Sequence, residues 1–460
     1  MVALASDRVD RSGTRPYDPA RMPIVPLALR RDPLDALAAL AADEPGAFLL
    51  DVPDSERPVT LLGCAPVDEA RIAADDPAPL ATIARIVGAA PPLDASLPFP
   101  LAGGTIGYLA YEVGAPRADV RDVLPVATLR RYDPVVAFDR ARRQYHLVSS
   151  DARTARAPWL ERLKAPVPAW TGPIGTAPLR ARWSAAAYRD AVARIRAYLV
   201  AGDVYQVNLT QPYDAPLAAP AWALAVRLAR VHPVPYRAYL DLGDAQIVMN
   251  SPELFLRRRG TRVETRPIKG TRPRGDGASA DAALAAELLA DAKERAEHVM
   301  IVDLERNDLG RVAETGSVRV DEYARVDTHP TVHHLVSTVS GTVRRDVDLA
   351  ALLAATFPGG SITGAPKRRA TEIIRELEPW PRGPYTGAVG LLDPRGDLEL
   401  ALAIRTAVVA NASVRWSAGG GIVADSDPAR ELAECGLKTA ALRLALGEPS
   451  VGALELCSSG

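Results

Sequence analysis

Apolar positions along this chain follow two spacings, and both recur over most of its length. A spacing near 3.6 predicts helices over residues 184–201, 280–289, 349–356 and 365–377. Two more helices are predicted from their N-cap signals. One begins at Asp291, and the other begins at Asp427 with Pro428 in its first turn and runs to about residue 446.

Short apolar stretches bounded by polar turns predict strands. They cover residues 47–50, 59–62, 135–138, 145–149, 245–249, 261–265, 388–392, 398–409 and 413–418, and residues 101–114 are predicted to form a glycine-bearing strand pair. Several of these strands follow one another directly, as in hairpins, and helices are interspersed among them. The pattern favours the α+β class over a strictly alternating parallel fold.

Residues 151–181 interrupt this regularity with prolines at positions 158, 166, 168, 173 and 178. We interpret the stretch as a linker. The predicted organisation is an N-terminal region over residues 1–150, the linker over 151–181, a main domain over 182–448 and a C-terminal tail over 449–460.

Composition excludes several classes of protein. Hydrophobic residues make up 48% of the chain, and the formal net charge of -1 includes no long block of one sign, so neither nucleic acid nor an anionic membrane is an expected partner. No apolar run could span a bilayer, and the polar N-terminus lacks a signal sequence, which predicts a cytoplasmic protein. Cys64, Cys435 and Cys457 are too scattered for a disulfide framework or a zinc site.

Lys269 is the first candidate for a catalytic residue, because nearly all of the basic residues in this chain are arginines. Of its 55 basic residues only five are lysines. Lysine can lose its proton and act as a nucleophile, which arginine cannot do. Three arginines within five residues of Lys269 should lower its pKa.

Glu253 follows a predicted strand and lies 16 residues before Lys269, across a predicted hairpin. A carboxyl group and a lysine at one site could act as an acid and a nucleophile. A simple salt bridge explains the same spacing equally well.

Two pairs of glutamates could supply oxygen ligands to a hard divalent cation. Glu294 and Glu297 share one face of a predicted helix, and Glu431 and Glu434 repeat the spacing on the last helix. Solvated helix faces often carry glutamates at this spacing, and spacing alone favours that explanation.

Two further features could bind an anion. Glycines at 419–421 precede a helix N-terminus, where bare backbone N–H groups can hold a carboxylate, although a tight turn is an equal alternative. Arg405 would end the first part of the 398–409 stretch, a strand over residues 398–404, and could clamp a carboxylate, although an isolated arginine is more often a surface residue.

Taken together, these segments resemble the chorismate-utilising enzymes, the family of anthranilate synthase component I, aminodeoxychorismate synthase component I and isochorismate synthase. The matching segments run in family order: GDVYQVNL (202–209), SPE (251–253), PIKGTR (267–272), AEHVM (296–300), RNDL (306–309), HLVS (334–337), GSITGAPK (360–367), YTGAVG (385–390), IRT (404–406) and GGGIV (419–423). The N-terminal region matches more weakly, mainly at GGTIGY (103–108).

The resemblance implies a fold of two large packed antiparallel β-sheets flanked by helices. It implies that Glu297 and Glu434 hold Mg²⁺, assisted by Glu294 and Glu431, and that the metal binds the ring carboxylate of chorismate. Arg405 and Tyr385 would clamp the enolpyruvyl carboxylate. The remaining substrate-binding residues would be Gln206, Gly270, Thr271, His334, Ser361, Gly419, Gly420, Gly421 and Lys438.

Two positions separate the subfamilies. Isochorismate and salicylate synthases carry a lysine where this chain has Gln206, and anthranilate synthases carry alanine where it has Lys269. Lysine at position 269 resembles the aminodeoxychorismate synthases, which implies formation of 4-amino-4-deoxychorismate, towards 4-aminobenzoate and folate. Lys269 would be the nucleophile and Glu253 the general acid.

No cysteine of the chain has the context of a glutaminase nucleophile, so ammonia is expected from a separate glutamine amidotransferase subunit in trans. Two alternatives remain open at this point. One is anthranilate synthase component I, which converts chorismate to anthranilate, and the other is a non-catalytic subunit that only binds a glutaminase.

Overall fold

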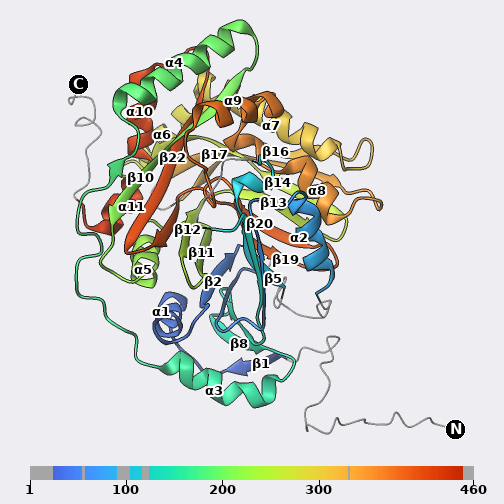
Figure 1. Cartoon of the computed structure of the whole chain (residues 1–460), viewed down its shortest axis with the longest axis vertical. Helices are drawn as coiled ribbons and strands as arrows, with labels where there is room; N and C mark the ends of the chain where they lie inside the picture. Colours follow the sequence, from blue (N-terminus) through green and yellow to red (C-terminus); the bar gives the residue numbers. More distant parts are fainter. Residues whose placement is uncertain (1–23, 54–56, 91–103, 117–123, 330–331, 449–460) are drawn as a thin grey trace, which may run out of the picture.

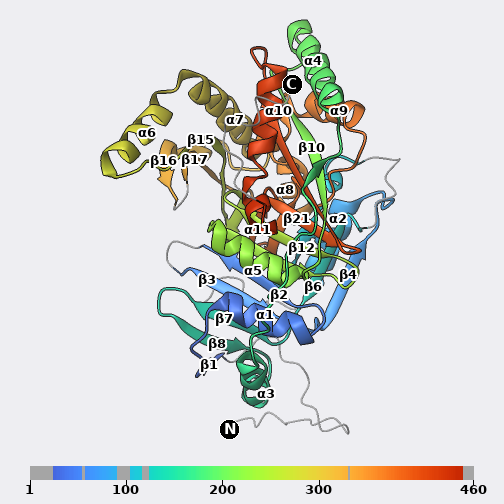
Figure 2. The ribbon, with the colours of Figure 1, turned by 90° about the vertical axis from the view of Figure 1, so that its left-hand side faces the viewer.

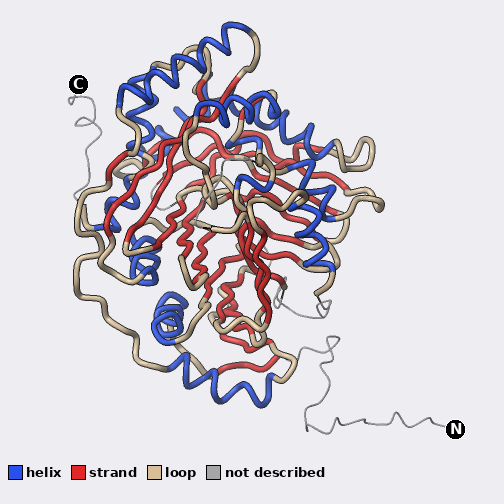
Figure 3. Tube along the Cα trace, in the orientation of Figure 1, coloured by secondary structure: helices blue, strands red, loops and turns tan. Residues whose placement is uncertain are grey.

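A computed structural model describes residues 24–53, 57–90, 104–116, 124–329 and 332–448. Two large sheets form its centre, with helices around them (Figures 1 and 3). Every pairing between the described strands is antiparallel. The α+β class and the two-sheet architecture expected from the sequence are therefore confirmed.

The first sheet, sheet A, has 12 described strands. In spatial order these are β1 (Ile24–Leu27), β8 (Gln144–Val148), β7 (Val135–Asp139), β3 (Val59–Gly63), β2 (Phe48–Val52), β11 (Tyr236–Asp241), β12 (Gln246–Ser251), β21 (Thr406–Ala410), β22 (Ser413–Ile422), β10 (Gln206–Pro216) and β18 (Gly364–Ala365), with β9 (Arg180–Ala181) beside β10.

The second sheet, sheet B, has 10 described strands. They are β15 (Ile268–Pro273), β17 (Val332–Thr342), β14 (Arg262–Arg266), β13 (Leu254–Arg259), β20 (Leu398–Leu402), β19 (Ala388–Leu392), β5 (Thr105–Leu109), β6 (Ala127–Arg131) and β4 (Asp68–Ile72), with β16 (Arg319–Thr328) beside β17.

The helices cover the outer faces and one end of these sheets. They are α1 (Pro33–Asp43), α2 (Pro79–Gly88), α3 (Ala152–Lys164), α4 (Ala185–Ala201), α5 (Ala221–Val231), α6 (Ala278–Ala290), α7 (Ala292–Gly310), α8 (Leu349–Thr356), α9 (Lys367–Leu377), α10 (Pro428–Leu437) and α11 (Ala440–Leu446), with short 3-10 turns η1 (Tyr111–Val113) and η2 (Gly360–Ile362). Figure 2 shows the successive helices α6 and α7 beside β15, β16 and β17, where they cover one end of sheet B.

Alternate residues of sheet A enter two different cores, as the two-residue period of a strand requires. Leu61 packs between the two sheets, whereas its neighbour Leu62 packs on the outer face with α1 and α5. Ile247 and Val248 divide in the same way. Sheet A is therefore buried on both faces, and its strands are apolar on both sides.

Both regions predicted from the sequence contribute strands to both sheets. In sheet A, β2 pairs with β11, and in sheet B, β5 pairs with β19. The stretch predicted as a linker contains α3, which packs against α1 and β1. The predicted division at residues 150 and 182 stays a prediction, and the tail at 449–460 lies outside the described residues.

Three predicted elements differ from those observed. Residues 101–114 contain one strand, β5, followed by η1, where a strand pair was expected; residues 101–103 lie outside the described part. The strand expected at 398–409 is two strands, β20 and β21, separated at Arg405. The last helix is broken into α10 and α11. The other helices agree closely, although α9 begins only at Lys367, because β18 and Pro366 precede it.

The predicted N-caps are confirmed by hydrogen bonds. The side chain of Asp291 accepts from Lys293 N and Glu294 N, and that of Asp427 accepts from Ala429 N and Arg430 N. Ser184, which was not predicted as a cap, accepts from Ala187 N at the start of α4. These caps fix where α7 and α10 begin, and so fix the placement of the glutamates in their first turns. Among the described residues, no helix combines the length and apolar character that crossing a membrane requires.

Glycine at 390 is required by close strand packing, which generates a stability prediction. A Cβ atom at Gly390 would lie 1.9 Å from the Glu399 carbonyl oxygen, whereas one at Gly88 would meet nothing within 4 Å. Gly390→Ala should lower the free energy of unfolding by about 1–3 kcal/mol or more, measured by urea denaturation. Gly88→Ala, the matched control at the end of α2, should leave stability unchanged or slightly higher. Equal stabilities of the two variants would contradict the strand packing described here.

Candidate active site

Ser361, in the η2 turn, brings the predicted acid and nucleophile together. Its hydroxyl donates to Glu253 Oε1 at 2.7 Å, and its carbonyl accepts from Lys269 Nζ at 3.4 Å. Glu253 precedes β13, while Lys269 lies on β15 at the edge of sheet B. Glu253 and Lys269, from two distant segments, therefore both contact Ser361 in a third segment. Their proximity does not depend on a direct salt bridge between them.

Burial sets the protonation of this pair. It raises the pKa of Glu253 from 4.5 to about 7, so a protonated acid is available near neutral pH. Burial also lowers the pKa of Lys269, and the cation of Lys438 lowers it further. Glu297, Glu253 and Glu434 act in the opposite direction, so the shift towards a free amine is the net result of opposing effects.

The direction expected for Lys269 from its sequence neighbours is correct, but the cause is different. Arg272 points towards α6 and α7, where it contacts Glu287 at 2.8 Å, Asp291 at 2.7 Å and Glu294 at 3.6 Å. Its charge is thus shared with three carboxylates, one of which, Glu294, belongs to the glutamate pair on α7. Desolvation is the main influence on Lys269.

The two glutamate pairs face one another across the mouth of the pocket. Glu294 and Glu297 project from α7, and Glu431 and Glu434 from α10. Glu434 influences the pKa of each of the other three. The close approach of Glu294 to the backbone of β15 requires glycine at position 270, because a Cβ atom there would lie 3.2 Å from Glu294 Oε2.

Cationic side chains partly neutralise these carboxylates. Lys438 contacts Glu434 at 2.7 Å and Lys293 contacts Glu297 at 3.8 Å. Within the described ranges, no three His, Cys, Asp or Glu side chains are gathered tightly enough to coordinate a metal directly. The sequence-based expectation of Mg²⁺ at Glu297 and Glu434 therefore stays a prediction.

The donor set nevertheless has the chemistry that Mg²⁺ requires. Burial raises the pKa of Glu294, Glu297 and Glu431, and a nearby carboxylate raises each of them further. A divalent cation would relieve this repulsion, and hard oxygen ligands are the ones it prefers. Glu431 also accepts from the Ser426 hydroxyl at 2.6 Å, which fixes its orientation.

Arg405 is placed by a break between β20 and β21, where its backbone adopts a left-handed φ of 49°. Burial lowers the pKa of its guanidinium to about 10, and no carboxylate within the described residues makes an ion pair with it. A buried arginine without an acidic partner has the character of a site for an anionic group of a ligand.

Of the three histidines around Arg405, sequence reasoning missed two, His232 and His329, and identified only His334 as a site residue. His232 Nε2 lies 2.7 Å from Arg405 Nη1, and burial together with Arg405 lowers its pKa to about 4. Burial lowers the pKa of His329 and of His334, and the positive charge of Arg405 lowers both pKa values further. The sequence held one clue to this cluster, because histidine is rare in the chain. It has only six histidines, and three of them lie around Arg405.

His334 and Thr271, both predicted to bind substrate, contact each other. The Thr271 hydroxyl lies 3.0 Å from His334 Nδ1, and His334 Nε2 is buried with no hydrogen-bond partner among the described residues. That nitrogen is available for a ligand. Tyr385 is buried near Arg382 and Cys435, and the predicted clamping of a carboxylate by Arg405 and Tyr385 together stays a prediction.

The glycine run at 419–421 is not the loop that the sequence suggested. Gly419, Gly420 and Gly421 belong to β22 and pair with β10. Their missing side chains make room for functional groups: a Cβ at Gly420 would lie 3.1 Å from Glu431, and one at Gly421 would lie 2.8 Å from the Gln206 amide. Both polar side-chain atoms of fully buried Gln206 lack hydrogen-bond partners in the part of the chain that the structure describes. Lys438 donates to the Gly419 carbonyl at 2.7 Å.

A family model described as chorismate binding enzyme matches residues 45–443. The chain belongs to the chorismate-binding enzymes. This confirms the resemblance inferred from the ordered segments and shows that the protein is an enzyme that uses chorismate.

Curated relatives of this chorismate-binding enzyme carry two different names. Anthranilate synthase component 1 of Thermus thermophilus is 44% identical over 366 residues, covering 77% of this chain and 79% of the relative. Aminodeoxychorismate synthase component 1 of Klebsiella aerogenes is 43% identical over 341 residues, covering 73% and 75%. Since the two identities are nearly equal, overall similarity does not separate the two reactions.

A solved structure agrees with the fold. Anthranilate synthase component I of Streptococcus pneumoniae superimposes with a TM-score of 0.74 at 30% identity, covering 84% of this chain and 92% of that one. The two-sheet core described above is therefore that of the chorismate-binding enzymes.

The raised pKa of Glu253 generates a prediction about stability. Because the pKa rises from 4.5 to about 7 on folding, the native state holds the proton more tightly, and this contribution to stability is lost as pH increases through 7. Glutamine does not titrate, so the Glu253→Gln variant lacks this loss of stability with increasing pH. Relative to wild type, the variant should gain up to about 3 kcal/mol between roughly pH 5 and pH 8 in urea unfolding. Glu161→Gln, at a side chain that is 77% exposed, is the control and should show no such trend. A constant difference between Glu253→Gln and wild type at both pH values would refute the buried acid.

Proposed function

We propose that this enzyme converts chorismate and ammonia to 4-amino-4-deoxychorismate, with Lys269 as the nucleophile and Glu253 as the general acid. The observation that carries the proposal is the shared contact of both groups with Ser361. A free amine and a protonated carboxyl are needed together. Near pH 7.4 an ordinary lysine is only about 0.1% free amine, so the lowered pKa of Lys269 supports this role.

The reaction has two substitutions. The Lys269 amine attacks C2 of chorismate, both ring double bonds shift by one position, and the C4 hydroxyl leaves as water with the proton of Glu253. Ammonia then bonds to C4, both double bonds shift back and Lys269 is expelled; the proton lost from the new amine restores Glu253. The net change is chorismate plus ammonia to aminodeoxychorismate plus water.

The two ends of the pocket suit the two carboxylates of chorismate. At one end, Mg²⁺ held by Glu297 and Glu434, assisted by Glu294 and Glu431, would bind and orient the ring carboxylate. At the other end, the guanidinium of Arg405, which has no acidic partner among the described residues, would bind the enolpyruvyl carboxylate together with Tyr385. The substrate would then lie with its ring between Lys269 and Glu253.

The nitrogen source follows from the names of the relatives. Several relatives are components 1 of aminodeoxychorismate synthases, including those of Klebsiella aerogenes and Bacillus subtilis. A component 1 implies a second component, and a glutamine amidotransferase that supplies ammonia in trans fits this reaction. Free ammonium should replace that partner in vitro.

Anthranilate formation is the second candidate, because the Thermus thermophilus relative bears that name at 44% identity. The two candidates differ in whether a lysine amine attacks C2. The non-catalytic subunit considered from the sequence is set aside, because the chain belongs to the chorismate-binding enzymes.

Lys269→Ala should abolish aminodeoxychorismate formation, with a loss of at least about 100-fold, because the covalent route is removed. The assay couples the product to a lyase that releases 4-aminobenzoate, and anthranilate is followed by its fluorescence. Lys164→Ala, at a half-exposed lysine on α3, serves as the matched control and should retain full activity. Undiminished amination by Lys269→Ala would disprove the nucleophile, and anthranilate as the sole product of wild type would favour the second candidate.

Removal of divalent metal should abolish turnover, and MgCl₂ should restore it. In the absence of chorismate, MgCl₂ should raise the melting temperature of wild type but not of Glu297→Gln or Glu434→Gln, because each removes a charged ligand. Glu161→Gln, distant from the pocket, should respond as wild type does. An equal response of all four proteins would show that these glutamates do not hold the metal.

A further inference from the structure

The guanidinium of Arg405 has an uncharged partner in His232. The distance from His232 Nε2 to Arg405 Nη1 is 2.7 Å. An arginine side chain has only N–H donors, so the histidine nitrogen accepts this hydrogen bond and the ring proton lies on Nδ1. Burial, followed by the charge of Arg405, lowers the pKa of His232 to about 4, so its ring is neutral near pH 7. The contact therefore orients the guanidinium without cancelling its positive charge.

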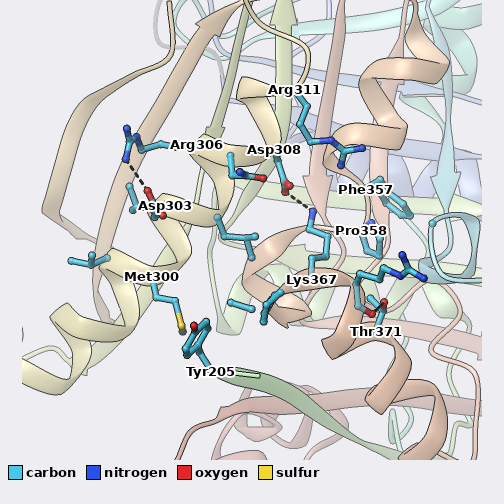
Figure 4. Close-up of a pocket in the computed structure, with 18 of the residues that line it drawn as sticks. Tyr205, Met300, Asp303, Arg306, Asp308, Arg311, Phe357, Pro358, Lys367 and Thr371 are labelled. Carbon is cyan, nitrogen blue, oxygen red and sulfur yellow. Dashed lines mark hydrogen bonds and ion pairs between the residues drawn. The ribbon is translucent and has the colours of Figure 1, made fainter. Parts of the chain in front are cut away.

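Two other cations of the interior show what a charged partner does instead. Arg382 forms an ion pair with Glu378 at 2.8 Å. In the cavity of about 1130 Å³ beside the second half of α7, Lys367 forms an ion pair with Asp308 (Figure 4). Each of these cations is neutralised by a carboxylate of the protein. Arg405, bonded to a neutral ring, keeps its charge for an anionic ligand.

Asn250, on β12, fixes the backbones of both partners. Its side-chain Nδ2 donates to the His232 carbonyl at 2.6 Å, and its backbone N–H donates to the Arg405 carbonyl at 3.0 Å. Asn250 is itself buried, and the His232 N–H donates to the Leu228 carbonyl at the end of α5. The ring and the guanidinium, which lie 173 residues apart in the sequence, are therefore held against one common residue.

The other groups that act on this pair keep the balance of charge in favour of a bound anion. His329 and His334 stand against each other with ring centroids 5.6 Å apart, and burial lowers the pKa of each. The carboxyl that influences Arg405 is that of Glu253, which is protonated in the proposed reaction. Neutral side chains thus surround a guanidinium that keeps its charge.

We propose that His232 is a positioning residue, which as a neutral acceptor holds the Arg405 guanidinium in the orientation that binds the enolpyruvyl carboxylate of chorismate. The inference rests on the proposed function, which assigns Arg405 to that carboxylate. His232 does not touch the substrate in this arrangement, and its whole effect passes through Arg405.

Three substitutions separate the properties of the ring. Glutamine keeps a neutral acceptor at a similar reach, leucine removes the acceptor, and glutamate keeps an acceptor but adds a negative charge that would pair with Arg405. If neutrality is what matters, glutamine and glutamate should behave in opposite ways although they are nearly equal in size.

The test is the KM for chorismate in the presence of MgCl₂ and excess ammonium chloride, with the remaining chorismate measured by liquid chromatography. His232→Leu should raise this KM at least about tenfold while kcat changes less than about threefold, because the interaction lost is made before the chemical step. His232→Gln should stay within about threefold of wild type. His232→Glu should have a higher KM than His232→Leu.

A double-mutant cycle shows whether His232 acts through Arg405. Arg405→Gln alone should raise the KM for chorismate at least about tenfold, and adding His232→Leu to it should raise the KM less than about twofold further. His146→Leu is the matched control, at a partly buried histidine on β8, near the far edge of sheet A. It should leave the KM unchanged, and the melting temperature is measured for every variant.

Equal KM values for His232→Gln and His232→Glu would overturn the inference, and this comparison decides it even if His232→Leu does not fold. Full additivity of His232→Leu and Arg405→Gln would also overturn it, since His232 would then act independently of Arg405. An unchanged KM in Arg405→Gln would instead refute the role of Arg405 in the proposed function.

Discussion

The arrangement of the pocket depends on the hydrogen bonds of one short turn, η2. Gly360 N bonds to Glu305, the Ser361 side chain and carbonyl bond to Glu253 and Lys269, and the Ile362 carbonyl accepts from Arg382 at 2.8 Å. Glu305 lies on α7, Glu253 precedes β13, Lys269 lies on β15, and Arg382 lies in the segment before β19. If the turn moves, the distance between acid and nucleophile changes with it.

Removal from water, more than any single neighbouring charge, determines the chemistry of this pocket. It is the largest influence on Glu253, Lys269, Arg405 and His334, and in each case it disfavours the charged form. The same desolvation that makes a carboxyl an acid and a lysine an amine also makes an unpaired arginine a strong site for an anion. The pocket therefore gains reactivity at the expense of stability.

Local rules predicted much of this molecule from its sequence. Capping residues located α7 and α10, a spacing near 3.6 located α4, and short apolar stretches between polar turns located most strands. The site residues were found through ordered segments, since single spacings favoured ordinary alternatives such as a solvated helix face for Glu294 and Glu297. The break at Arg405 was missed because apolar residues continue on both sides of it, and nothing local signals a left-handed arginine.

Long-range features were beyond local rules. The glycines at 419–421 looked like a loop, because the groups that need the space, Glu431 and Gln206, come from elsewhere in the chain. His232 and Arg405 are 173 residues apart, and no periodicity connects them. The cavity between Tyr205, α7 and Lys367 is lined by segments far apart in the sequence, so it could not be predicted from local patterns.

The sharing of both sheets between the two ends of the chain has a consequence for synthesis on the ribosome. Strand β5 pairs with β19, which begins at Ala388, and β2 pairs with β11, which begins at Tyr236. As the first 150 residues emerge, both of these strands have an edge with open hydrogen-bonding groups, and they must wait for partners not yet translated. Such edges invite pairing with other nascent chains. Protection during translation is thus a requirement built into the strand order of this fold.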